Sequence, residues 1–261
     1  MDRCIHRVSA WLALAGLSVL VCACNAGQSD NTDVSVQGNW SGQYAAAGAK
    51  QSIPVFALIQ KGGSAYLFDS TGVIYHLPSF SGSEKVSGPV TAYPAMGFTF
   101  ADGSSSMDLD MNGTAASTGI NVDLDGDGNS GQARSGQAQL LPLETYYGES
   151  SVAEGQWTGI YISPAPQSLA LDVKADGDFS GNDAYGCTLQ GHLTQLGEHE
   201  TLFSVAIHST GASSACGGTL TGLAHESAYD TFNLFQGAQG TYYYLAASNS
   251  KTAFIAEFKV Q

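Results

Sequence analysis

Apolar and polar residues alternate along much of this chain. The segments 169–174, 203–208 and 254–260 each place apolar side chains on one face of an extended strand. Beyond the first 23 residues, no longer segment shows the spacing of an amphipathic helix. The pattern therefore predicts an all-β protein.

Turn signals separate these segments. Ala175 to Asp178 contains an Asp-Gly pair typical of a hairpin, and 211–213 and 237–240 have the composition of loops. The chain contains 32 glycines, 12 tyrosines and 11 phenylalanines. Such a mixture favours short strands joined by tight turns over helices.

The second half of the chain predicts eight strands in a meander, which suits a small closed antiparallel barrel. Closure removes the exposed strand edges that a sandwich would leave, so we place a barrel ahead of a sandwich. The expected strands lie near 157–162, 168–175, 186–194, 201–208, 216–224, 230–236, 241–247 and 253–260.

A short motif, G-x-W-[ST]-G-x-Y, occurs twice. It predicts two tandem β modules, 38–143 and 155–261, joined by a polar junction at 144–154. A single β domain with a chance coincidence is the alternative. The motif residues are Gly38, Trp40, Gly42 and Tyr44 in the first copy and Gly155, Trp157, Gly159 and Tyr161 in the second.

The first 23 residues have the features of a cleaved signal peptide. Arg3 and Arg7 precede an apolar run from Val8 to Val21 that is short for a membrane span. The segment Val21-Cys22-Ala23-Cys24 resembles the lipobox of bacterial lipoproteins. That resemblance implies palmitate or other acyl chains on Cys24, a flexible lipid-anchored linker at 24–37 and a place in the cell envelope. Modification of Cys22, or an ordinary leader that releases a soluble protein, are the alternatives.

Asn25 follows the cysteine expected to carry the lipid. It is not the aspartate that often signals inner-membrane retention in enteric lipoproteins, so the resemblance favours the outer membrane.

The G-x-W of each module is also similar to the opening of lipocalins, in which a tryptophan closes one end of an eight-stranded barrel. No further lipocalin motif follows, and we use this second resemblance only in support of barrel geometry.

Two cysteines remain once the leader is removed and Cys24 is lipidated. An exported protein with one such pair predicts a disulfide between Cys187 and Cys216, near the ends of two non-adjacent strands. A reactive or metal-binding thiol pair is the alternative, although neither cysteine belongs to a C-x-x-C motif.

The chain is acidic, with a formal net charge of −14. Such a surface repels phosphate backbones, so we expect no nucleic-acid partner, and membrane attachment must come from the acyl chains.

The opening of a calcium loop is present at Asp123, Asp125 and Asp127, but Arg134 stands where the bidentate acid would lie. Asp-Gly hairpin turns explain the same residues, and we predict no metal or cofactor.

No catalytic motif stands out. Glu198 to Glu200 has the composition of a solvated loop, and alternate tyrosines of Tyr242-Tyr243-Tyr244 are expected to face core and solvent. We therefore expect a non-enzymatic envelope lipoprotein that binds an envelope or host protein, or a small apolar ligand. An envelope hydrolase with a site assembled from several strands and a purely structural or assembly lipoprotein are the alternatives. A hollow barrel would favour the small ligand, and a filled barrel would favour a protein partner.

The lipobox resemblance predicts which cysteine is modified. In cells fed radiolabelled palmitate, the wild-type chain and C22A should carry the label, and C24A should lose it because the modified sulfur is gone. Label retained in C24A but lost in C22A would move the modification to Cys22. An unlabelled wild-type chain would indicate an ordinary leader.

Overall fold

The computed structural model describes residues 36–60, 62–80, 85–126, 134–143, 151–197, 201–213 and 215–261. The signal peptide, Cys24, most of the expected linker, Asp127 and most of the expected junction lie outside these residues. Asp33–Gln261 forms one compact unit. No helix occurs in the described ranges, so none there has the length and apolarity needed to cross a membrane.

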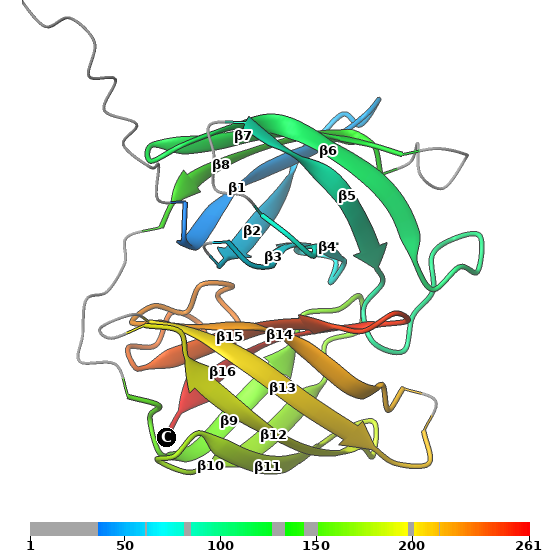
Figure 1. Ribbon diagram of the computed structural model, residues 1–261. Coiled ribbons are helices and arrows are strands. Elements are labelled where there is room, and N and C mark those ends of the chain that lie inside the picture. Colours follow the sequence, from blue (N-terminus) through cyan, green and yellow to red (C-terminus); the bar gives the residue numbers. More distant parts are fainter. Residues whose placement is uncertain are drawn as a thin grey trace, which may run out of the picture. The chain divides into compact units, whose positions relative to one another are not determined.

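The first barrel closes when its last strand pairs with its first, and every neighbouring pair is antiparallel (Figure 1). Its strands are β1 (Gly38–Ala46), β2 (Ile53–Ile59), β3 (Ala65–Asp69), β4 (Ile74–Leu77), β5 (Lys85–Tyr93), β6 (Met107–Ala116), β7 (Gly119–Asp125) and β8 (Gly136–Pro142).

The second barrel has the same order, with its last strand paired to its first (Figure 1). Its strands are β9 (Gly155–Tyr161), β10 (Ser168–Val173), β11 (Asp178–Asp183), β12 (Thr188–Gln195), β13 (Leu202–Thr210), β14 (Gly218–Ser227), β15 (Tyr242–Ser248) and β16 (Ala253–Val260). The prediction of an all-β fold with two tandem barrels is confirmed, and the sandwich alternative is wrong.

Two predictions for individual strands are wrong. Residues 230–236 form turns, because the Asp230 carboxylate accepts hydrogen bonds from nearby backbone N–H groups that a strand would pair with a neighbour. The sequence analysis also missed β11, whose only large apolar side chain is Phe179. The Asp-Gly hairpin predicted at 175–178 joins β10 to β11, with the Gly177 N–H donating to the Lys174 carbonyl.

Alternate side chains of each strand fill the interior of its barrel. In the first barrel these include Trp40, Leu67 and Met111, and in the second they include Trp157, Phe203 and Phe258, all at most 3% exposed. The predicted one-sided apolar faces therefore build two separate packed cores.

Glycines inside strands let these small barrels coil. A Cβ on Gly42 would lie 1.7 Å from the Gln139 carbonyl oxygen across the β1–β8 pair. A Cβ on Gly181 would lie 1.9 Å from the Ala170 oxygen across β10–β11. Strands that approach this closely need glycine, which explains part of the high glycine content.

A third apolar cluster joins the two barrels. It contains outward-facing side chains of β2, β3 and β4 together with outward-facing side chains of β14, β15 and β16. Phe68 lies 6.4 Å from Tyr244 between ring centroids, and the Tyr66 hydroxyl donates to the Thr221 carbonyl at 3.0 Å. Other members of the cluster include Leu58, Ile74, Leu223, Ala246 and Ile255.

Tyr243 and Tyr244 show that both faces of β15 are buried. Tyr243 points into the second barrel and Tyr244 points the opposite way, so the expected alternation of these side chains is confirmed. The expectation that one face of this strand meets solvent is wrong, because Tyr244 is covered by the first barrel and Tyr242 is also buried. The strands at this contact are apolar on both faces.

The repeat offers a matched comparison for this contact. The register of β2 with β3, set against that of β10 with β11, places Phe68 of the first barrel at the position of Asn182 in the second. Phe68 is fully buried between the barrels, whereas Asn182 is exposed.

Replacement of Phe68 by alanine should lower the free energy of unfolding by about 3–5 kcal/mol, because the cluster between the barrels loses a buried ring. The control N182A should change it by less than about 0.5 kcal/mol. Urea denaturation of both variants measures the difference, and equal effects would contradict the role given to this cluster.

Candidate functional site

The repeated motif closes each barrel and faces inward. The Trp40 indole N–H donates to the Val36 carbonyl at 3.0 Å, and the Trp157 indole donates to Ala153 at 2.9 Å. The motif glycines Gly38 and Gly155 both have positive φ, 128° and 138°. The two tryptophans hold equivalent places in the two barrels and are buried, so the motif serves the fold rather than a ligand.

A second repeated element was missed by the sequence analysis. Asp69 and Asp183 each accept the backbone N–H groups two and four residues later, and a glycine with positive φ completes each hairpin, Gly72 and Gly186. The shared pattern Asp-x-x-Gly is visible in the sequence, but its spacing from the tryptophan motif differs between the copies. It strengthens the evidence for tandem modules of common origin.

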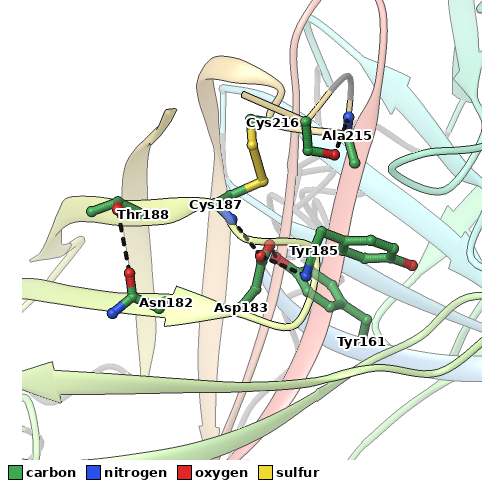
Figure 2. Close-up of a disulfide and its surroundings, with 9 residues drawn as sticks. Tyr161, Asn182, Asp183, Tyr185, Cys187, Thr188, Ala215 and Cys216 are labelled. Atoms are coloured by element: carbon green, nitrogen blue, oxygen red, sulfur yellow. Dashed lines mark hydrogen bonds between the residues drawn. A yellow bond between two sulfur atoms is a disulfide. The ribbon is translucent and has the colours of Figure 1, made fainter. Parts of the chain in front are cut away.

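Cys187 and Cys216 form the predicted disulfide, with Cα atoms 5.4 Å apart (Figure 2). They precede β12 and β14, which are separated by β13, so the bond links non-adjacent strands at one end of the barrel. The Asp183 carboxylate accepts the Cys187 N–H at 2.8 Å and the Tyr161 hydroxyl at 2.8 Å. The disulfide and the hydrogen bonds of Asp183 together stabilise this end of the second barrel.

The first barrel has an ion pair at the matching hairpin. The Arg134 guanidinium lies 3.1 Å from the Asp69 carboxylate and 3.3 Å from the Tyr75 hydroxyl. Burial raises the pKa of Tyr75 well above its ordinary value, with the Asp69 charge adding to the effect. Arg134, noted above for its place in the incomplete calcium pattern, therefore has a structural partner.

The calcium candidates do not converge in the described part of the chain. Asp123 and Asp125 point outward from β7 and are exposed. Among the residues that the structure describes, no group of three or more histidine, cysteine, aspartate or glutamate side chains could hold a metal ion. Asp127 lies outside those residues, so the expectation that this segment binds no calcium stays untested.

One acid and one histidine meet on the outside of the second barrel. Asp178 and His192 are cross-strand neighbours, and the Nδ1 atom of His192 lies 2.8 Å from the carboxylate. Both side chains are about half exposed, at 56% and 46%. His192 and Ser204 line one shallow pocket on this surface. The Ser204 hydroxyl donates to the Thr194 carbonyl at 3.4 Å.

The candidate binding site is a groove of about 660 Å³. One side is formed by β1, β2 and β8, and the other by the segment after β14. Leu141 and Tyr229 line it from the two barrels and are 64% and 73% exposed, which is unusual for large apolar side chains among the residues that the structure describes. Polar groups complete the lining, namely the Asp230 carboxyl group and neutral side chains that include Asn39, Ser41, Gln43, Ser227 and Thr231.

Residues 228–241, between β14 and β15, form the far side of the groove, and we call them the wedge loop. Phe232 of this loop packs between the barrels, with its ring centroid 4.4 Å from that of Phe56 and 5.9 Å from that of Phe68. The wedge loop is the segment that the strand prediction at 230–236 misassigned.

A buried carboxyl group lies under the wedge loop. Glu257 on β16 is fully buried and accepts the Thr231 N–H at 2.6 Å and the Phe232 N–H at 3.3 Å. Burial raises the pKa of Glu257 to about 8, and the neighbouring Asp230 adds to the shift.

A buried histidine lies at the contact between the barrels. The His225 ring nitrogens lie 3.1 and 3.2 Å from the Asn39 amide nitrogen, and Nε2 lies 2.9 Å from the Thr201 hydroxyl. Its ring also stacks on that of Tyr244. Burial lowers the pKa of His225 to about 3.

None of the groove or wedge-loop residues was singled out from the sequence. The available signal was the near-continuous apolar character of β3, β4, β15 and β16, which alternation does not explain. That signal predicts strands covered on both faces, and hence a contact at whose margin a groove can form.

Comparisons with known proteins are sparse. No family model matches the chain, and no curated protein matches it. Among solved structures, it is similar to a Bacteroides fragilis protein described as a "putative outer membrane protein", with 12% identity and a TM-score of 0.28. The match covers 87% of this chain and 97% of that one, but a TM-score this low does not establish a shared fold.

The buried His225 predicts an acid-sensitive fold. Between pH 6.5 and about 3 the unfolded chain binds a proton that the folded chain excludes, so the stability falls as the pH falls through this window. The loss from this residue should approach about 5 kcal/mol at its low end. Denaturation midpoints measured across this range should fall less steeply in H225Q than in the wild type. The exposed control H208Q should keep the wild-type slope, and a wild-type slope in H225Q would contradict the prediction.

Proposed function

We propose that this chain is a non-enzymatic lipoprotein of the bacterial envelope that binds a protein partner through the groove beside the wedge loop. The observation that carries the proposal is the contrast between filled barrels and an exposed groove. Buried side chains occupy both interiors, whereas Leu141 and Tyr229 remain exposed on the outside.

A protein partner fits this contrast better than a small apolar ligand. Barrels that carry such ligands enclose an apolar cavity, and here those positions are taken by aromatic and aliphatic side chains. The groove is open and mixes two exposed apolar groups with neutral hydrogen-bonding groups and the Asp230 carboxyl group. Interfaces between proteins have this composition, with aromatic anchors and a polar rim.

The proposed anchor is the lipid on Cys24, with the outer membrane as the favoured location. Support for both comes from the lipobox and from Asn25. Several acyl chains hold a protein firmly without help from surface charge, and the chain's net charge of −14 offers no attraction to anionic headgroups.

The arrangement of titratable groups favours binding over catalysis. His225 and Glu257, two groups with strongly shifted pKa values, are buried between packed elements where no substrate reaches them. The accessible pair Asp178 and His192 lies beside a serine that donates its hydroxyl proton to a backbone carbonyl instead. An activated nucleophile would need that hydroxyl directed at the histidine.

Site-specific crosslinking in living cells tests the proposed groove. A photoreactive amino acid at position 229 or 141 should form one discrete covalent adduct with the same partner, because both positions line the groove. The same group at Asp172, exposed on β10 away from the groove, should not. Y229A should weaken the adduct formed from position 141.

Two results would overturn the proposal. Equal adducts from positions 229 and 172 would show that the contact is not specific to the groove. An apolar molecule retained in stoichiometric amount in native mass spectra would return the small-ligand alternative.

A further inference from the structure

We propose that the wedge loop is a latch, held in place by the proton on Glu257, so that one side of the groove loosens as the pH rises. The inference rests on the proposed function, since it assigns a regulatory property to the same groove. It draws on three features of the loop, namely its carboxyl anchors, its backbone conformation and the groups around Glu257.

Two carboxyl groups hold the wedge loop by its backbone. Glu257 accepts the N–H groups of Thr231 and Phe232, and Asp230 accepts those of Leu234, Phe235 and Gly237 at 2.8 Å each. Five backbone N–H groups of the wedge loop therefore donate hydrogen bonds to two carboxyl side chains. Because Glu257 belongs to β16 and not to the loop, it ties the loop to the barrel.

The backbone of the loop is strained where these anchors hold it. Asn233 and Gln236 have φ values of 55° and 60°, a region that residues with a side chain adopt at a cost. They are the two positive-φ residues other than glycine in the described part of the chain. Such conformations persist only where surrounding contacts enforce them, so weaker anchors should release the loop.

The surroundings of Glu257 act on its charge in both directions. Burial and Asp230 disfavour a negative charge, the N–H groups of Thr231 and Phe232 favour it, and burial is the largest effect. Asp230 lies beside it, and the Tyr242 and Tyr244 rings of β15 border it. Lys259, two residues along the same strand, has its ammonium 6.0 Å from the centre of the Tyr242 ring. His225 stacks on the far partner, Tyr244, and burial keeps it neutral above about pH 3.

The raised pKa of Glu257 determines whether the wedge loop loosens as the pH rises or as it falls. With the loop seated, burial holds the pKa of Glu257 at about 8, and release that exposes the carboxyl group to water would return it toward its ordinary 4.5. Between these values the released form loses a proton that the seated form retains. The ratio of released to seated loop should therefore rise about tenfold per pH unit from 4.5 to 8 and level off above 8.

Release would alter the groove directly. Tyr229, Asp230 and Thr231 line it, and the next residue, Phe232, is the ring wedged against Phe56. A loop that lifts from Glu257 would carry Tyr229 away from Leu141 and withdraw Phe232 from the cluster between the barrels. The groove should thus keep its described shape at acidic pH and lose it toward alkaline pH.

Amide hydrogen exchange of the intact chain tests the latch. After correction for intrinsic rates, protection of the Thr231 and Phe232 amides should fall about tenfold per unit between pH 5 and 8 in the wild type. In E257Q, whose side chain keeps an acceptor but has no proton to lose, protection should change less than tenfold over the whole range. The exposed-carboxyl control D172N should follow the wild type.

Constant protection in the wild type, or a wild-type slope in E257Q, would overturn the latch. If E257Q does not fold, the wild-type protection of the Thr231 and Phe232 amides decides alone, because the latch requires that protection to fall with rising pH. A pH-dependent loop without groove-specific crosslinks would reject the partner and keep the latch. Groove-specific crosslinks with a pH-independent loop would do the reverse.

Discussion

The apolar contact between the two barrels is the constraint on which the rest of the structure depends. Each barrel has its own core, but β2 to β4 and β14 to β16 carry apolar side chains on their outer faces as well. Those outer faces would lie exposed on an isolated barrel, where patches of this kind promote aggregation. The first and second halves of the chain are therefore built to be covered by each other.

This contact also explains where the polar groups with shifted pKa values occur. His225, Glu257 and Asn39 lie in or beside a surface that packing has removed from water. A buried carboxyl or imidazole stays neutral at a cost in stability, and chains retain such groups where they specify geometry or a switch. In this protein Asn39 and His225 join the two barrels, and Glu257 fixes the wedge loop.

Sequence reasoning recovered the fold because its signals are local. The alternation within strands, the Asp-Gly turn, the repeated tryptophan motif and the cysteine pair each depend on neighbouring residues or on simple counting. It failed at β11, where glycine and polar residues replace the apolar face, and at 230–236, where a carboxylate captures the backbone N–H groups. The groove was beyond reach for a different reason. It is formed by β1, β2, β8 and the wedge loop, whose proximity only the contact between barrels creates.

The two barrels meet through non-equivalent faces, which has a consequence for assembly. Matching the strand registers shows that the face offered by the second barrel corresponds to β6, β7 and β8 of the first. A head-to-tail contact of this kind between related units has no built-in end, and a third barrel could in principle join by the same geometry. The chain prevents this by chemistry: the first barrel carries exposed Asn112, Asn121, Asp123 and Gln137 where the second carries Leu223, Tyr244, Ala246 and Ile255. Asp123, which was considered above as a calcium ligand and set aside, belongs to this polar face and is unsuited to the apolar contact that the second barrel makes.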